Sequence, residues 1–170
     1  MKQIGAIFLF LLLGLSVFAQ NDDDNNISSN FIIDLIHKVE WPAGSNLDSF
    51  VINVVGDDKM VPALKSVAQS KSNKKVIINS LSLNDNFEQC QILFIATDSL
   101  SHLAKILKRV ENKPILTVSN QGTFARYGVM INIRDVKNNK IKYAVNNMTA
   151  RKAKLKISDD LLKKAVETFG

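Results

Sequence analysis

Residues 50–58 read Phe-Val-Ile-Asn-Val-Val-Gly-Asp-Asp, an almost wholly apolar run that ends in a glycine and two aspartates. Its β-branched side chains show no alternation with polar ones, which is typical of a strand buried on both faces. Residues 91–96, Gln-Ile-Leu-Phe-Ile-Ala, form a second run of this kind, and residues 114–118 begin a third. Strands of this type occur mostly in parallel sheets that carry helices on both sides.

Segments with helical periodicity alternate with these strands. Apolar residues recur on one helix face over residues 100–110, and a shorter stripe occupies residues 61–68. A third stripe at residues 31–39 follows Ser28 and Ser29, either of which can cap a helix. Alternating strands and helices favour an α/β fold, in which helices flank a central sheet.

The pattern changes in the C-terminal part of the chain. Residues 129–134 and 141–145 alternate apolar with other side chains, and Lys-Asn-Asn-Lys at 137–140 is typical of a turn, so an antiparallel hairpin is predicted. Its edge is expected to be exposed, which would allow two copies to pair as a homodimer. Ser158 is predicted to cap a last helix whose apolar side runs to Phe169.

The sequence therefore predicts an α/β fold in a single-domain sandwich. A central mixed sheet is flanked by helices, and a C-terminal antiparallel hairpin is followed by a helix. We expect this domain to span residues 28–170. A disordered leader is expected over residues 20–27, which are polar and rich in aspartate and asparagine.

Residues 1–19 are expected to form a cleavable signal peptide. Lys2 gives a positive start, an apolar run covers residues 4–17, and Val17 and Ala19 occupy the positions that signal peptidase reads. The run of about 14 residues is shorter than the ~20 that a membrane-spanning helix needs. An exported chain has no access to ATP, nicotinamide cofactors or the chromosome. We therefore expect no cofactor, no nucleic-acid partner and no transmembrane segment in the mature chain.

Charge is distributed unevenly along the chain. Residues 20–100 contain 6 Lys/Arg and 11 Asp/Glu, whereas residues 101–170 contain 15 Lys/Arg and 5 Asp/Glu. A basic half is suited to an anionic ligand, an acidic partner surface or a membrane face, and it is equally explained as a solvated surface. Scattered cations with few aromatic residues are not typical of nucleic-acid binding.

Groups that carry catalysis are sparse in this sequence. His37 and His102 lie far apart, without a metal-ligand cluster around either, so no metal site is predicted. Cys90 directly precedes a buried strand and is interpreted as a packed, inert thiol. As the only cysteine it has no partner for an intramolecular disulfide. No catalytic residues are predicted, and the chain is not expected to be an enzyme.

Polar residues at the predicted strand ends form a candidate ligand pocket. Gly56, Asp57 and Asp58 follow the first buried strand, and Ser119 and Asn120 follow a later one. Ligands of open α/β sheets bind at this edge. Loop polarity and helix capping explain the same residues without a ligand, so both interpretations stay open.

The segment Glu40-Trp41-Pro42 joins the only tryptophan to the end of a predicted helix. An aromatic residue at such a break is suited to anchoring a partner, and it is equally suited to closing the end of the core. Under the first interpretation Trp41→Ala weakens partner binding while the domain stays folded. Under the second, the same substitution unfolds the domain.

Several short segments occur together in a characteristic order. They are Val39-Glu40-Trp41-Pro42, Val55-Gly56-Asp57-Asp58, residues 90–95, residues 115–119, Phe124-Ala125, Gly128, Met130-Ile131-Asn132, Asn146, Lys154-Leu155, Ile157-Ser158 and Leu161-Leu162. In this order and spacing they resemble the YfiR-like family of bacterial periplasmic proteins, over roughly residues 31–168.

The resemblance implies a periplasmic α/β domain, often dimeric, that acts as a negative regulator of a membrane diguanylate cyclase. Such proteins bind the periplasmic part of the cyclase and lower cyclic-di-GMP synthesis, exopolysaccharide and biofilm. Members also occur beside or fused to sensor histidine kinases, so the partner stays open between a cyclase and a sensor kinase. This chain departs from the family at Gly128-Val129, where paired glycines are usual, and at Cys90, which is alone where some members have cysteine pairs.

We therefore expect a periplasmic, non-catalytic regulator that binds the extracytoplasmic part of a membrane signalling protein. The residues expected to contact this partner are Glu40, Trp41, Pro42, Phe124, Arg126, Gly128, Asn146 and Arg151. The alternative is a periplasmic small-ligand sensor that works with a histidine kinase, with its pocket at the strand ends.

Overall fold

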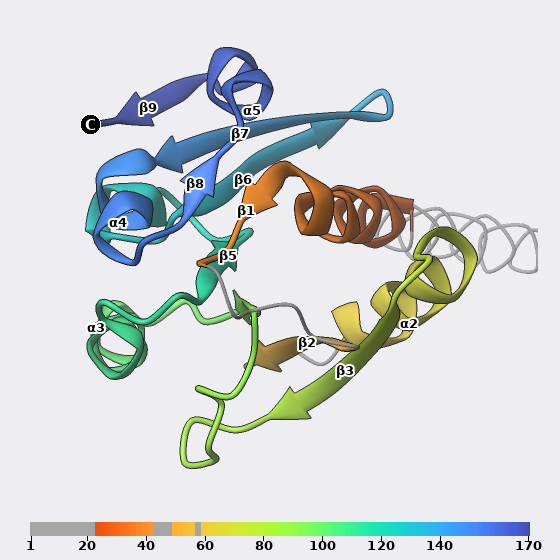
Figure 1. Cartoon of the computed structure of the whole chain (residues 1–170), viewed down its shortest axis with the longest axis horizontal. Coiled ribbons are helices and arrows are strands. Elements are labelled where there is room, and N and C mark those ends of the chain that lie inside the picture. The colour runs from red at the N-terminus through yellow and green to blue at the C-terminus, as the bar shows by residue number, and fades with distance from the viewer. Residues whose placement is uncertain (1–22, 43–48, 57–58) are drawn as a thin grey trace, which may run out of the picture.

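Seven strands form the central sheet, in the order β3-β2-β4-β5-β6-β7-β9 (Figure 1). The computed structural model describes residues 23–42, 49–56 and 59–170. The strands are β2 (Ser49–Val55), β3 (Lys75–Leu81), β4 (Ile92–Ile95), β5 (Leu116–Ser119), β6 (Ile131–Lys137), β7 (Lys140–Asn146) and β9 (Glu167–Phe169). Neighbours from β3 to β6 are parallel, β7 is antiparallel to β6, and β9 is parallel to β7. This is the mixed sheet that the sequence predicts.

The three strands predicted from apolar runs lie side by side at the centre of the sheet. Every residue of β4 and β5 is buried, and in β2 only Ser49 and Val51 are partly exposed. Their continuous apolar sequence follows from this position, because neither face of a central strand meets water when helices cover both sides.

Helices cover the two faces of the sheet (Figure 1). The helix over residues 23–38 and α2 (Met60–Lys71) pack on one face and share an apolar cluster with β2, β4, β5 and β6. On the other face, α3 (Leu100–Val110) packs through Leu103 and Ile106. Of the apolar stripe predicted at residues 100–110, Leu103 and Val110 lie on this buried side of α3, whereas Leu100 and Ala104 are exposed.

The N-terminal helix differs from the prediction at its start. Residues 23–30 are already helical, so the disorder predicted for residues 20–27 does not extend to residues 23–27. Ser28 and Ser29 are buried inside the helix and do not cap it. Two aspartates precede them in the helical segment, on the side where the helix dipole favours negative charge. The predicted signal peptide lies outside the described residues.

The C-terminal segment also differs from the prediction. Ser158 caps α5 (Asp159–Lys164), as predicted, by accepting a hydrogen bond from the Leu161 N–H at 3.4 Å. The helix does not continue to Phe169, because the backbone becomes extended and the following residues pair with β7 as β9. Part of the hairpin edge that was expected to be exposed is therefore covered.

The predicted hairpin itself is confirmed. Asn138 and Asn139 join β6 to β7, with φ angles of 51° and 57°. Asparagine adopts this left-handed conformation more readily than most residues, and two such residues in succession are typical of a tight hairpin turn.

Four short elements were not predicted. They are β1 (Val39–Glu40), β8 (Lys156–Ile157), the 3₁₀ helix η1 (Phe124–Tyr127) and α4 (Asn147–Lys152). β1 and β8 pair antiparallel as a separate two-stranded sheet, which joins the end of the N-terminal helix to the C-terminal part of the chain. In the described part of the chain, no helix is long and apolar enough to cross a membrane.

Candidate functional site

Two buried asparagines hold η1 in place through a single residue, Ala125. The side chain of Asn132 accepts a hydrogen bond from the Ala125 N–H at 3.2 Å. The side chain of Asn146 donates to the Ala125 carbonyl oxygen at 2.8 Å. The two asparagines are 0% and 4% exposed. Because these polar groups are paired inside the protein, they fix the backbone of η1 (the asparagine clamp).

The asparagine clamp changes the role of two residues that were expected to contact a partner. Asn146 also caps α4, because its side chain accepts a hydrogen bond from the Thr149 N–H at 2.9 Å. Phe124 is buried in the apolar cluster beneath α3. Both side chains therefore support the local backbone, and the accessible groups of this region belong to their neighbours.

Those accessible neighbours are Arg126 and Tyr127. The Tyr127 side chain is exposed, and the Arg126 guanidinium forms an ion pair with Glu167 on β9 at 3.2 Å. Gly128 then ends η1 with a φ of 108°, a conformation that favours glycine, and its N–H donates to the Ala125 carbonyl oxygen. Arg126 and Gly128 therefore lie in η1 and at its end, and the expectation that they contact a partner stays a prediction.

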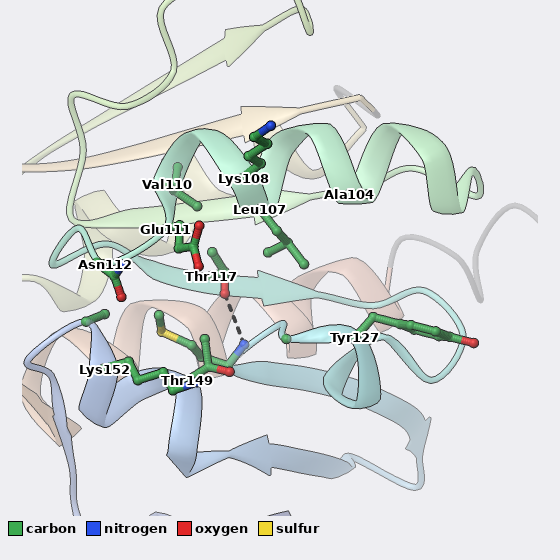
Figure 2. A pocket seen from close by; sticks show the side chains of 13 residues that line it. Ala104, Leu107, Lys108, Val110, Glu111, Asn112, Thr117, Tyr127, Thr149 and Lys152 are labelled. Atoms are coloured by element: carbon green, nitrogen blue, oxygen red, sulfur yellow. Dashed lines mark hydrogen bonds between the residues drawn. The ribbon is translucent and has the colours of Figure 1, made fainter.

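A groove of about 380 Å³ lies beside η1, between α3 and α4 (Figure 2). Leu107 of α3 and Glu111, which directly follows α3, point toward it, and Thr149 and Lys152 border it from α4. Between these walls lies Thr117 of β5, whose hydroxyl accepts a hydrogen bond from the backbone of another lining residue, Met130, at 3.0 Å. This α3–α4 groove is within the size range of ligand and side-chain pockets, roughly 300–1,000 Å³.

Trp41 lies beside a different cleft, of about 560 Å³. Its ring packs edge-on against Phe50, with centroids 4.9 Å apart and an interplanar angle of 84°. The ring is half-buried against the larger apolar cluster, and the indole N–H is buried with no hydrogen-bond partner in the described part of the chain. These contacts favour the interpretation of Trp41 as a residue that closes the core.

The neighbours of Trp41 are more accessible. Glu40 is exposed on β1 and forms an ion pair with Lys156 of β8 at 3.0 Å, while Pro42 is half-buried. The Trp41 cleft and the α3–α4 groove share no lining residue, and different parts of the α3–β5 connection border them: residues 113–115 line the first and residues 111–112 line the second. The structure therefore does not bring the expected partner-binding residues into one cleft.

The strand-end pocket predicted from the sequence is only partly assembled. Gly56 lines a cleft of about 480 Å³ together with Thr97, Asp98 and His102. A Cβ at Gly56 would collide with the carbonyl oxygen of Ala96, so the close approach of the ends of β2 and β4 requires glycine at this position. This cleft is polar and lies at the sheet edge where ligands of α/β folds bind.

Ser119 and Asn120, also predicted for that pocket, do not line this cleft. Ser119 is fully buried, and its hydroxyl donates a hydrogen bond to the Ile95 carbonyl oxygen at 2.7 Å. Asn120 is exposed and lines a separate cleft of about 410 Å³. Asp57 and Asp58 lie outside the described residues.

Cys90 is buried, as the sequence predicts, and burial raises the pKa of its thiol to about 12. The thiol is therefore protonated at neutral pH and is a poor nucleophile. His37 lies exposed on the N-terminal helix and His102 lies on α3, far from it in the fold. Within residues 23–42, 49–56 and 59–170, no group of three His, Cys, Asp or Glu side chains is arranged to hold a metal ion.

The sequence of the whole folded domain decides the family. Residues 25–166 match the profile of the YfiR/HmsC-like family. The chain belongs to this family. The match runs from the N-terminal helix to the end of the α5 segment, which confirms the YfiR-like resemblance found in the sequence. Among curated proteins, none is similar enough in sequence to count as a match.

Two solved structures share the fold of this YfiR/HmsC-like domain at low sequence identity. A conserved domain protein from Vibrio cholerae has a TM-score of 0.57 at 13% identity, with 82% of this chain and 60% of that chain covered. The ABC domain in complex with L-Trp from Streptococcus pneumonia has a TM-score of 0.53 at 10% identity, with 71% and 55% covered. The YfiR/HmsC-like chain thus spans little more than half the length of these proteins, and the likeness shows the fold alone.

The two positions at which the sequence departs from the expected family pattern both lie in described segments of this YfiR/HmsC-like chain. A single glycine, Gly128, forms the turn after η1, and the next residue, Val129, is buried. The only cysteine is buried and unpaired, so an intramolecular disulfide cannot control this domain.

Proposed function

We propose that this YfiR/HmsC-like protein is a periplasmic, non-catalytic regulator. It binds the extracytoplasmic part of a membrane diguanylate cyclase and represses synthesis of cyclic-di-GMP, and with it biofilm formation. Family membership over residues 25–166 is the observation that carries this proposal. A binding protein represses such an enzyme only by binding its inactive conformation more tightly than its active one.

Exposed residues around η1 and α4 support a docking role for this part of the protein. Arg126 and Arg151 are exposed cations on these two elements, and Gly128 shapes the turn between them and the sheet. In the proposed complex the two arginines meet acidic groups of the partner. Glu40, Trp41 and Pro42 contribute a second contact region beside the Trp41 cleft.

Two measurements test the regulator function. Purified protein is titrated against the extracytoplasmic domain of each membrane diguanylate cyclase of its organism by surface plasmon resonance, and cyclic-di-GMP is measured in cells that lack the protein. We expect saturable binding to one cyclase and a several-fold rise of cyclic-di-GMP that re-expression reverses. Unchanged cyclic-di-GMP together with no binding to any cyclase would contradict the proposal. Binding to a sensor kinase instead would replace the cyclase as the partner.

A small-ligand sensor is the second candidate function. The polar cleft at the ends of β2 and β4 favours it, as does the fold shared with a domain that is described in complex with L-Trp. A thermal-shift screen against amino acids and small anions tests it, because a ligand that binds only the folded state raises the melting temperature in a saturable manner. His102→Ala, in the cleft, should abolish the shift, while His37→Ala on the exposed N-terminal helix should retain it. No saturable shift with any compound would contradict this function.

A further inference from the structure

Two segments that flank the α3–α4 groove are entirely free of acidic residues. Neither residues 99–110 nor residues 147–156 contain an aspartate or a glutamate, and Glu111, which directly follows the first segment, is the acidic residue in the lining of the groove. The first segment comprises α3 and its cap, and the second comprises α4 and β8. Together they carry seven cations: Lys105, Lys108, Arg109, Arg151, Lys152, Lys154 and Lys156.

Five of these seven cations have no carboxylate partner among the described residues. Arg109 pairs with Glu88, and Lys156 pairs with Glu40. The other five are exposed, and none of them forms an ion pair with any acidic side chain of the described segments. They are Lys105, Lys108, Arg151, Lys152 and Lys154. Mutual repulsion of like charges disfavours such a surface, and an acidic partner would relieve that repulsion.

The directions of two of these lysines indicate what kind of molecule they meet. Figure 2 shows Lys108 directed away from the interior of the groove, while Lys152 borders the opposite wall. These charges are therefore suited to a partner that extends beyond the groove on both sides. A small molecule enclosed between the walls would reach only one of them.

The groove between the two basic rims is suited to an apolar side chain. Leu107 and Met130 line it, and Gly128 leaves its end open, since a Cβ there would meet only the Leu107 and Thr149 side chains at 3.6 and 3.9 Å. The asparagine clamp holds the adjoining η1 rigid, so this surface does not have to become ordered when a partner binds. A concave, preformed groove favours a protein segment over a flat lipid surface.

We propose that the α3–α4 groove and its basic rims are the docking surface for an acidic protein segment, which inserts an apolar side chain between Leu107 and Met130. This inference rests on the proposed function, because it names the surface through which the regulator holds its partner. Lys108 and Lys152 supply the charge contacts on the two rims.

Site-specific photocross-linking in cells tests this surface. The photoreactive residue p-benzoylphenylalanine is placed at Ala104 or Thr149, which line the groove, and at Lys65 on α2 as a control on the opposite face of the sheet. We expect a protein adduct from the two groove positions and not from Lys65. Mass spectrometry of the adduct should identify a partner peptide with net negative charge.

A double variant that reverses the charge of both rims measures how much the adduct depends on them. Lys108→Glu combined with Lys152→Glu should lower the Thr149 adduct by about tenfold or more, because both rims then repel an acidic partner. The matched control, Lys137→Glu combined with Lys140→Glu, makes the same charge change at the exposed turn between β6 and β7 and should leave the adduct unchanged. All four lysines are exposed, so both variants should retain the circular dichroism and melting temperature of the native protein.

The outcomes separate this inference from the proposed function. A charge-dependent groove adduct with a diguanylate cyclase supports both, and one with another protein supports the groove while overturning the cyclase as partner. Only lipid adducts, no groove adduct from folded exported protein, equal adducts from Lys65, or an adduct that is insensitive to Lys108→Glu and Lys152→Glu would each overturn the docking surface. In those cases the cyclase-binding measurement above still decides the proposed function.

Discussion

The asparagine clamp at η1 and the packing of Trp41 against Phe50 each bury a polar N–H group, but only the first of these groups has a hydrogen-bond partner among the described residues. At η1, the Ala125 N–H and carbonyl oxygen each have a buried asparagine side chain as partner. At Trp41, the indole N–H is buried beside Phe50 without any hydrogen-bond partner among the described residues. A buried polar group without a partner costs about 1–3 kcal/mol. The comparison indicates a rigid support at η1 and a less well satisfied contact at Trp41.

Breaking the asparagine clamp should have the largest effect. Asn132→Ala leaves the Ala125 N–H without its acceptor, and Asn146→Ala removes both a clamp bond and the cap of α4. We expect each to lower the free energy of unfolding by about 2–4 kcal/mol, measured by urea denaturation.

Asn120→Ala is the matched control, because Asn120 is exposed and its side chain accepts a hydrogen bond from the neighbouring Gln121 side chain. It should change the free energy of unfolding by less than about 0.5 kcal/mol. Losses for the clamp variants that are no greater than that of the control would show that η1 is held by something other than the asparagines.

Substitutions of Trp41 should show how much its ring stabilises the core and how much its unpartnered N–H costs. Trp41→Ala removes a half-buried ring from Phe50 and the core, so the free energy of unfolding should fall by about 2–3 kcal/mol. Trp41→Phe keeps an aromatic contact and removes the unpartnered N–H, so its loss should be under about 1 kcal/mol. Both are measured by thermal and urea unfolding. Equal losses for the two variants, or full stability of Trp41→Ala, would contradict the core role of Trp41.

Alkaline pH should weaken the fold progressively. Burial raises the pKa of Cys90 from 9.0 to about 12, and burial followed by the negative charge of Asp160 raises that of Tyr143 from 10.0 to about 12. Both groups lose their proton more readily in the unfolded chain. Their stabilising contribution is therefore complete below pH 9 and is lost as the pH rises toward 12, with a slope of at most about 1.4 kcal/mol per pH unit for the thiol.

Unfolding free energies at pH 8, 9, 10 and 11 measure this slope. Cys90→Ala and Tyr143→Phe should each flatten it, since each removes one titrating group. Tyr143→Phe also removes the hydrogen bond to the Leu161 carbonyl oxygen, so it should lower stability at pH 8 as well. An identical slope in both variants and the native protein would refute the assignment to these two groups.

The smallest effect is expected for the ion pair beside Trp41. Glu40 and Lys156 are 72% and 74% exposed, so their attraction is screened by water and salt. A double-mutant cycle with Glu40→Ala and Lys156→Ala should give a coupling below about 1 kcal/mol. A larger coupling would mean that the β1–β8 pair depends on this contact more than on the apolar residues behind it.

Long apolar or periodic segments were predicted well from the sequence. β2, β4 and β5 and the helix α3 follow from runs whose burial leaves a clear pattern, and the turn at Asn138 and Asn139 follows from local backbone preference. Elements of two to four residues, such as β1, β8 and η1, carry too few residues to show a period.

The end of α5 shows why local pattern alone is insufficient. Leu161, Leu162, Ala165, Val166 and Phe169 fit one side of a helix as well as they fit the observed structure. Pairing with the free edge of β7 converts the last of them into a strand, which is a long-range contact that no local window contains.

The candidate site was predicted in part for the same reason. The sequence indicated the neighbourhood of Arg126, Gly128 and Arg151, because the family resemblance and local turn signals mark it. It did not show that Asn146 is a buried clamp, since an asparagine before a helix looks the same whether its amide faces solvent or another segment. The acid-free segments around Lys108 and Lys152 were visible in the sequence, but only the fold places them on two walls of one groove.

The position of β9 has a consequence for how the chain reaches its folded state. Ala144, Val145 and Asn146 of β7 pair with residues 167–169, which are synthesised after every other strand of the sheet. Until then, β7 presents an unpaired edge, and unpaired edges attract other strands. Removal of residues 167–170 is therefore expected to promote aggregation during folding, although it deletes only three residue pairs from the sheet.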